Sequence, residues 1–149
     1  MVYLIKKPKG FTLMELLVAM AIIVILAGMA VSGAQMARKR GVLTKAKAAI
    51  AAIEAAIDMY ELDTGEYPAA GNQNLVTALT DMDNTSPEWN GPYMRFKEED
   101  FLDGEYLDPW GRPYVYISPG THNRGFYDIY SFGPNGEDEQ GEGDDLGNW

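Results

Sequence analysis

Hydrophobic and polar positions follow two successive patterns in the first sixty residues. From Leu16 to Ala37 no residue is charged, and at ~1.5 Å per residue this stretch covers the ~30 Å hydrocarbon core of a bilayer. We therefore expect a membrane-spanning segment there. Between residues 43 and 60, apolar side chains recur three or four residues apart, which predicts one buried stripe along a helix. The stripe consists of Leu43, Ala46, Ile50, Ile53, Ile57 and Tyr60.

The two patterns belong to one continuous helix. Residues 42–64 contain neither Pro nor Gly, and strong helix formers dominate them. The helix is predicted from about Phe11 to about Leu62, which corresponds to roughly 75–80 Å at the standard rise. Gly65 predicts a left-handed cap at its C-terminus, and Pro68 follows shortly after.

The remainder of the chain alternates short elements with turns. Residues 72–80 predict a short amphipathic helix, and the polar residues 81–91 predict a loop. Two runs rich in aromatic and β-branched residues, 114–119 and 126–132, are separated by a glycine-containing loop. This arrangement predicts an antiparallel hairpin. The expected fold class is α+β, with a long N-terminal helix packed on a small antiparallel sheet.

Charge and composition exclude several classes of function. The formal net charge is -10, and eight of the twelve Lys and Arg residues precede residue 48. The acidic remainder argues against a nucleic-acid partner, because phosphates require a basic surface. The chain has no cysteine, so neither a disulfide nor a thiolate site is available. Its one histidine, His122, lies in the predicted hairpin loop and is expected to be an exposed turn residue. We expect no catalytic residue and no enzyme.

Glu15 is the one acid beside the long apolar run. An ionised carboxylate at the centre of a membrane costs at least ~2.5 kcal/mol, so it requires a partner or hydration at the headgroups. Cleavage between Gly10 and Phe11 would create an α-amino group that could pair with Glu15 of a neighbouring helix. A conventional secretory signal is the alternative, with cleavage after Ala30 or Ala34, and it would remove Glu15.

The segment FTLMELLVAMAIIVILA, residues 11–27, preceded by a short basic leader ending in Gly, resembles the class III signal sequence of type IV pilins and type II secretion pseudopilins. The resemblance implies that a prepilin peptidase cleaves after Gly10, that the Phe11 amine is N-methylated and that Glu15 guides subunit assembly. It also implies a type IV pilin-like fold.

The same resemblance implies an organisation and a location. Residues 1–10 would be the leader, residues 11–37 the transmembrane half of the helix and filament core, and residues 38–149 a pilin-like head. The chain would be held as a single-pass protein of the bacterial inner membrane, with its head in the periplasm, before assembly into a periplasmic filament.

Four segments of the head resemble the major pseudopilins in particular: IDMYELDTGEYP (57–68), LDPWGRPYVYISPG (107–120), YDIYSFGPNG (127–136) and DDLGNW (144–149). This resemblance implies a structural subunit that polymerises into the periplasmic pseudopilus of a type II secretion system and drives protein export across the outer membrane. Minor pseudopilins and an inner-membrane assembly platform would be its partners.

Three alternatives remain open at this point. One is a type IV pilin of an adhesion, motility or DNA-uptake system, whose C-terminal region is more often closed by a disulfide. Another is a secreted calcium-binding module. The third is a membrane-anchored hydrolase that uses the acids near the C-terminus.

Residues 137–145 hold six acids in nine positions and are followed by the apolar anchors Leu146 and Trp149. A solvated acidic tail is one interpretation. The other is a cation-binding loop, because hard cations such as Ca²⁺ take six to eight oxygen ligands. The spacing is not that of an EF-hand.

The resemblance to major pseudopilins implies one Ca²⁺ in this loop. The matching ligands are the Phe132 carbonyl, the Asn135 side chain and Asp144, with Asp145 as a further candidate. Asn135 supplies an oxygen without a charge, and the loop is about two residues longer than usual, so Glu137 or Glu142 is expected to compensate.

Overall fold

The computed structural model describes residues 10–81, 84 and 86–149, with the side chains of residues 29–33 outside that description. Of the predicted leader only Gly10 is described, and the predicted loop 81–91 is described in part. The chain divides into two compact units, with the boundary between Arg40 and Gly41. Each unit is described below by itself.

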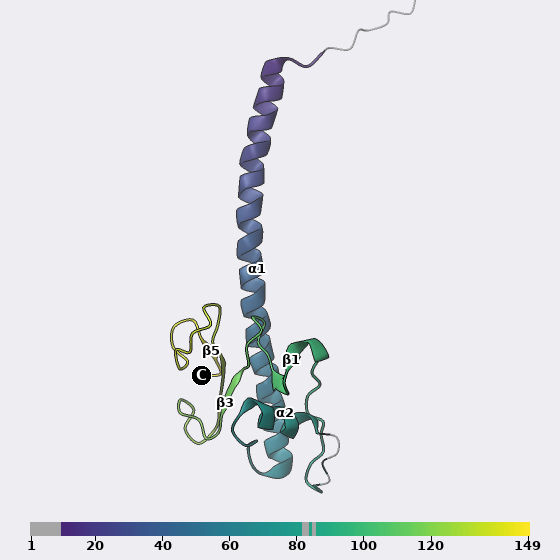
Figure 1. Ribbon diagram of the computed structural model, residues 1–149, viewed down its shortest axis with the longest axis vertical. Helices are drawn as coiled ribbons and strands as arrows, with labels where there is room; N and C mark the ends of the chain where they lie inside the picture. Colours follow the sequence, from purple (N-terminus) through teal and green to yellow (C-terminus); the bar gives the residue numbers. More distant parts are fainter. Residues whose placement is uncertain (1–9, 82–83, 85) are drawn as a thin grey trace, which may run out of the picture. The chain divides into compact units, whose positions relative to one another are not determined.

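Helix α1 (Leu13–Thr64) contains 52 residues (Figure 1). It begins and ends within two residues of the predicted limits. Gly65 adopts φ +80°, and its N–H donates to the carbonyl of Glu61 at 2.8 Å, so the predicted left-handed cap is confirmed. The helix continues through residues 29–33, although their side chains are not described. No helix made of described residues combines the length and hydropathy needed to cross a bilayer.

The core of the second unit forms where α1 packs on the rest of the head. Ala46, Ile50, Ile53 and Ile57 are at most 3 % exposed, which confirms the predicted stripe. Helix α2 (Asn72–Thr80) packs on the same core and also confirms its prediction. The buried cluster comprises Ile50, Ile53, Ala56, Ile57, Leu75, Leu79, Tyr114, Tyr116, Tyr127 and Ile129.

Two small antiparallel sheets complete the head. A 3₁₀ turn (Glu98–Asp100) leads into the hairpin of β1 (Phe101–Leu102) and β2 (Glu105–Tyr106). The second sheet has the order β3-β4-β5, from β3 (Val115–Ile117), β4 (Asp128–Ser131) and β5 (Leu146–Gly147). The β3–β4 pairing confirms the predicted hairpin. The sequence did not predict β5 or the β1–β2 hairpin, because two-residue strands are too short to show a period.

The buried side chain of Asn72 connects α2 to the chain on both sides of the 106–114 turn. Its Nδ2 donates to the carbonyls of Tyr106 and Tyr114 at 2.9 and 2.7 Å, and its Oδ1 accepts from the Tyr106 N–H at 2.7 Å. These three hydrogen bonds satisfy a buried amide and fix α2 against the head.

Candidate functional site

The first turn of α1 is closed by reciprocal hydrogen bonds between Thr12 and Glu15. The Thr12 N–H and hydroxyl both donate to Glu15 Oε2 at 2.9 Å, and the Glu15 N–H donates to Thr12 Oγ1 at 3.2 Å. This is a capping box, with each residue satisfying a donor of the other. The carboxylate at the predicted assembly position therefore already has partners within its own chain.

The predicted cleavage site lies immediately before this cap. Gly10 and Phe11 are outside the helix, and Phe11 is 87 % exposed. An exposed peptide bond outside a helix is accessible to a peptidase, whereas a bond inside a helix is not. The described geometry is therefore compatible with cleavage between these two residues.

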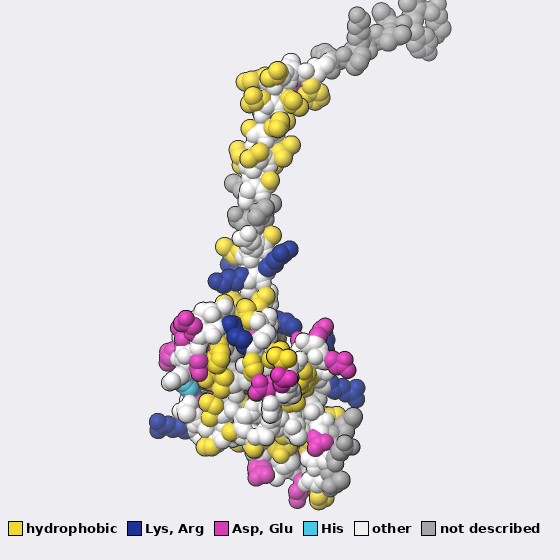
Figure 2. Space-filling view, viewed as in Figure 1, with side chains coloured by type: hydrophobic (Ala, Val, Ile, Leu, Met, Phe, Trp, Pro, Cys, Tyr) yellow, Lys and Arg dark blue, Asp and Glu magenta, His cyan; other side chains and the backbone are white. Residues whose placement is uncertain are grey.

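Large apolar side chains cover the first turns of α1 and are exposed in this unit (Figure 2). Exposed apolar surface on this scale indicates contact with lipid or with another protein. The side chains concerned are Leu13, Met14, Leu16, Leu17, Val18, Met20, Ile22, Ile23, Val24, Ile25 and Leu26.

The acidic loop, residues 137–145, and the turn before it bring several predicted cation ligands close together. The Asn135 N–H donates to Asp144 Oδ2 at 3.1 Å. A Cβ on Gly133 would lie 2.0 Å from the Asp144 carbonyl oxygen, so the backbone next to Phe132 also approaches Asp144. These contacts hold the start of the loop, at Gly133 and Asn135, close to its end at Asp144.

Glu139 was not among the predicted ligands, yet it lies between two of them. Its Oε2 accepts from Asn135 Nδ2 at 3.3 Å and from the Asp144 N–H at 3.0 Å. Gly143 has φ +58°, and an added Cβ would lie 2.0 Å from the same oxygen, so a side chain there would have a strained backbone and would displace the Glu139 carboxylate. The acidic run pointed to Glu139 as one acid of six, but sequence spacing did not distinguish it from the others.

The two carboxylate oxygens of Asp145 differ in their hydrogen bonding. Oδ2 accepts from the N–H groups of Glu139 and Gly141 at 3.1 and 2.8 Å. Oδ1 is buried and accepts no hydrogen bond from any residue that the structure describes. A buried acceptor without a donor is costly, so this oxygen is the position in the loop that most favours a cation.

Glu137 and Glu142, the predicted compensating acids, have exposed side chains. Only their backbone groups hold the loop, with the Glu137 N–H donating to Asn135 Oδ1 at 2.7 Å and the Glu142 carbonyl accepting from the Asp145 N–H at 3.0 Å. Within the described part of the chain, no three acidic or histidine side chains are grouped closely enough to hold a metal ion. The predicted ligands are thus neighbours but do not converge on one point.

His122 and Trp149 connect the acidic loop to the β3–β4 loop. His122 Nε2 forms a hydrogen bond of 2.8 Å with the Gln140 carbonyl, and its ring stacks on the indole of Trp149. His122 is exposed, as predicted, and it also holds two other segments of the head through these contacts.

Tyr130 makes a further contact with the acidic loop. Its hydroxyl donates to Asp138 Oδ1 at 3.3 Å. Burial and the nearby Asp138 carboxylate raise the pKa of Tyr130 to about 12, so the hydroxyl remains a donor at neutral pH.

A buried carboxylate supports the start of the loop. Asp108 accepts from the N–H groups of Trp110 and Arg112 at 2.9 and 3.0 Å and from the Ser131 hydroxyl at 2.5 Å. The Arg112 guanidinium donates to the Gly133 carbonyl. The turn before β3 therefore positions the backbone that enters the acidic loop.

Comparison with known proteins identifies the family. Residues 35–149 match the family model "Type II secretion system (T2SS), protein G", and residues 5–31 match the "Prokaryotic N-terminal methylation motif". The chain belongs to the type II secretion system protein G family. This result confirms the predicted resemblance and decides against an adhesion pilin, a secreted calcium-binding module and a hydrolase.

Named relatives agree with this family over nearly the whole chain. The type II secretion system core protein G of Pseudomonas aeruginosa is 37 % identical over 145 residues, covering 97 % of this chain and 96 % of the relative. The core protein G of Escherichia coli K12 is 36 % identical over 143 residues, covering 96 % and 92 %.

A solved structure agrees as well. The major pseudopilin from the type 2 secretion system of enterohaemorrhagic Escherichia coli is 28 % identical, with a TM-score of 0.50, over 75 % of this chain and 86 % of that one. The type IV pilin-like α+β fold is thereby confirmed. This member of the protein G family is a structural pseudopilin and not an enzyme.

Proposed function

We propose that this chain polymerises through its N-terminal helix into the periplasmic pseudopilus that drives protein export across the outer membrane. The observation that carries the proposal is the methylation motif at residues 5–31, followed by exposed apolar side chains on α1. Before assembly, residues 11–37 hold the subunit in the inner membrane with its head in the periplasm. Minor pseudopilins and an inner-membrane assembly platform are its expected partners.

Glu15 gives assembly its register in this proposal. Prepilin peptidase cleaves after Gly10, which leaves an amine on Phe11, and this amine is then N-methylated. Because a carboxylate in an apolar environment requires an opposite charge, Glu15 of one subunit pairs with the Phe11 amine of a neighbour. Incorrect staggering would leave both charges unpaired.

The intact mass and N-terminal sequence of the chain, recovered from membranes of its native host, test this proposal. We expect a start at methylated Phe11. A Glu15→Gln variant should be processed normally but should fail to form filaments, and Glu61→Gln, on the same helix, serves as its control. A mature start after Ala30 or Ala34 would overturn the proposal, since it removes Glu15.

We further propose that the acidic loop binds Ca²⁺, as the resemblance to major pseudopilins implies. The unpartnered Asp145 Oδ1 and the proximity of Asn135 to Asp144 support this. The Phe132 carbonyl, Asn135, Asp144 and Asp145 would hold the ion, and Glu139 fits the compensating role better than Glu137 or Glu142. A bound ion would supply the positive charge that six clustered acids lack.

Thermal melting of the purified full-length protein, with and without a chelator, tests the calcium proposal. We expect the melting temperature to fall in chelator and to recover when Ca²⁺ is added in excess, because a ligand of the folded state stabilises it. Equal melting temperatures under both conditions would overturn the proposal.

A further inference from the structure

The head contains two asparagines that are followed directly by glycine, Asn90-Gly91 and Asn135-Gly136. This dipeptide deamidates readily, because glycine has no Cβ to hinder the backbone nitrogen that attacks the side-chain amide. Neither pair belongs to a helix or strand, and both asparagine side chains are exposed. The surroundings of the two pairs differ, so the fold determines which of them reacts.

A hydrogen bond folds the Asn135 side chain over the nitrogen of Gly136. The Glu137 N–H donates to Asn135 Oδ1 at 2.7 Å, which forms an Asx turn. The ring closed by this hydrogen bond contains both Asn135 Cγ and the Gly136 nitrogen, so the two atoms that must join are already held close together. The same N–H stabilises the negative charge that develops on Oδ1 when Cγ is attacked.

A cation lies beside the same backbone. A Cβ added at Gly136 would collide with Nη1 of Arg112, so the guanidinium lies directly against the glycine. Arg112 is held there by its hydrogen bond to the Gly133 carbonyl. Its positive charge favours loss of the Gly136 amide proton, which makes the nitrogen a nucleophile.

We propose that Asn135-Gly136 is a site of spontaneous deamidation in the folded protein. The Gly136 nitrogen bonds to Asn135 Cγ, the Cγ–Nδ2 bond breaks, and Nδ2 leaves as ammonia with the proton lost from Gly136. Water then opens the resulting succinimide. Cleavage of the new Cγ–N bond gives aspartate, whereas cleavage of the original peptide bond gives isoaspartate, in which the chain continues through the side chain. Water is the only co-reactant, and it reaches this exposed residue.

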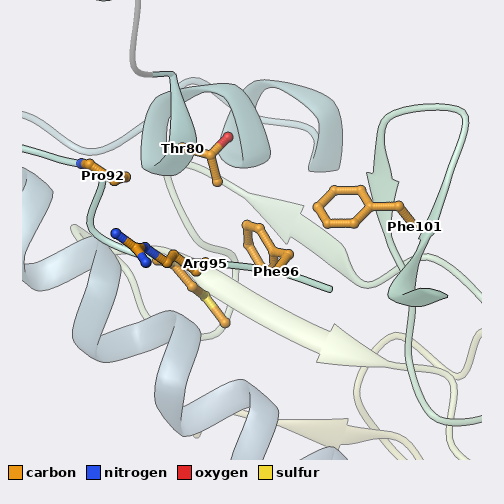
Figure 3. Close-up of a pocket in the computed structure, with 6 residues that line it drawn as sticks. Thr80, Pro92, Arg95, Phe96 and Phe101 are labelled. Carbon is orange, nitrogen blue, oxygen red and sulfur yellow. The ribbon is translucent and has the colours of Figure 1, made fainter. Parts of the chain in front are cut away.

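The surroundings of Asn90 make it the less reactive of the two asparagines. The Trp89 indole donates to the Ala78 carbonyl at 3.0 Å, and an added Cβ on Gly91 would collide with the indole ring. On the other side, Pro92 lines an apolar pocket of about 460 Å³ (Figure 3). Among the described residues, none donates a hydrogen bond to the Asn90 side chain. The backbone at Gly91 is therefore held on both sides, and the neighbouring amide is not activated.

Deamidation at position 135 changes the charge of the acidic loop. Asn135 Nδ2 donates to Glu139 Oε2 at 3.3 Å, and in the product a carboxylate oxygen replaces this donor. Repulsion between two carboxylates then replaces a hydrogen bond. The reaction itself requires neither the proposed filament nor the proposed calcium ion.

Peptide mapping by mass spectrometry tests the proposal on purified full-length protein incubated at neutral pH. We expect aspartate and isoaspartate to accumulate at position 135 at least tenfold faster than at position 90. In denaturant both pairs lose their surroundings and should react at similar rates. Glu137→Pro removes the N–H that donates to Asn135 Oδ1 and should slow the reaction at position 135 at least tenfold. Glu137→Gln keeps that N–H and is the matched control.

Equal rates at the two positions in the folded wild-type protein would overturn the proposal, as would an intact Asn135 after Asn90 has reacted. This comparison requires no variant, so it decides the proposal even where Glu137→Pro does not fold. Circular dichroism checks the fold of each variant. An unchanged rate at position 135 in folded Glu137→Pro would contradict activation by the Asx turn.

Discussion

The imidazole ring of His122 lies flat on the indole of Trp149, with the ring centroids 4.2 Å apart and the planes inclined by 2°. His122 belongs to the β3–β4 loop and Trp149 is the last residue of the sequence, so this stack joins two segments far apart in the chain. With the hydrogen bond from His122 to the Gln140 carbonyl, it holds both the end of the chain and the acidic loop against the head.

Gly141 provides the first prediction, because it lies against Trp149. A Cβ at this position would lie 1.9 Å from the indole, and the backbone has φ +85°. Gly141→Ala should therefore lower the free energy of unfolding by roughly 2–3 kcal/mol, from a strained backbone together with a displaced indole. Chemical denaturation of the purified protein measures this loss.

Gly125→Ala is the matched control for this substitution. Gly125 has nearly the same φ, +88°, and no atom lies within 4 Å of the added Cβ. It should cost only the backbone strain, about 1 kcal/mol. Equal losses in the two variants would show that contact with Trp149 contributes nothing to stability.

The three hydrogen bonds of Asn72 provide the second prediction. Asn72→Ala removes both donors and the acceptor from a buried position, so the Tyr106 N–H and the Tyr114 carbonyl lose their Asn72 partner, while the Tyr106 carbonyl keeps only the Tyr114 N–H at 3.1 Å. The free energy of unfolding should fall by about 3 kcal/mol. Asn74→Ala, which removes one exposed hydrogen bond to the Ala70 carbonyl, should cost less than about 1 kcal/mol. A loss at position 72 no larger than at position 74 would contradict the connecting role of Asn72.

Asp128 provides the third prediction, which concerns pH. Burial alone would raise the pKa of this carboxyl, but hydrogen bonds from the N–H groups of Asn123, His122 and Thr121 and from the Thr121 hydroxyl outweigh it, so the pKa lies below its ordinary value. The stabilisation is complete above the unfolded-state pKa, near pH 4, and is lost as the pH falls through the lower folded-state value. Unfolding free energies near pH 7 and near pH 3 should differ accordingly.

Asp128→Asn tests the origin of that dependence. The amide cannot accept all four hydrogen bonds, so the variant should be less stable by about 3 kcal/mol near pH 7 and should lose part of its sensitivity to acid. Asp103→Asn, at an exposed position in the β1–β2 turn, should leave the pH profile unchanged. An unaltered profile in the Asp128 variant would contradict the assignment.

Asp145 provides the fourth prediction, which separates calcium binding from folding. An Asn at this position keeps one oxygen for the two N–H donors and replaces the unpartnered, buried Oδ1. In chelator the Asp145→Asn protein should be as stable as the wild type within about 1 kcal/mol. In Ca²⁺ it should lack the increase in melting temperature expected of the wild type. Glu98→Gln, outside the loop, should keep that increase.

The helical stripe and the β3–β4 hairpin could be predicted because each has a clear local pattern, a helical spacing in the first and two strand-forming runs around a turn in the second. Residues 43–60 repeat at helical spacing, and their burial followed from that spacing alone. The hairpin had two long aromatic runs around a loop with glycine. The strand β5 has two residues and lies where Asn148 Oδ1 accepts from the Ile129 N–H at 3.0 Å and Trp149 contacts Tyr130, so its position depends on tertiary contacts rather than on local pattern.

The acidic loop shows the same limit at the level of single residues. Composition left a solvated tail and a cation-binding loop both open, and the family resemblance selected Asn135 and Asp144, which the fold does bring together. The choice of Glu139 over Glu137 and Glu142 depends on which way each carboxylate turns. The backbone between Glu139 and Asp144 is left-handed at Gly141 and Gly143, and a list of acids does not reveal the resulting course of the loop.

The capping box of Thr12 and Glu15 has a consequence for the energetics of the proposed pairing. Because Glu15 Oε2 already accepts from the amide and hydroxyl of Thr12, the amine of a neighbouring subunit would, under that proposal, approach a carboxylate whose charge is already shared with two donors. Such a pairing would release less free energy than pairing with a bare carboxylate, because part of the charge is satisfied before the neighbour arrives.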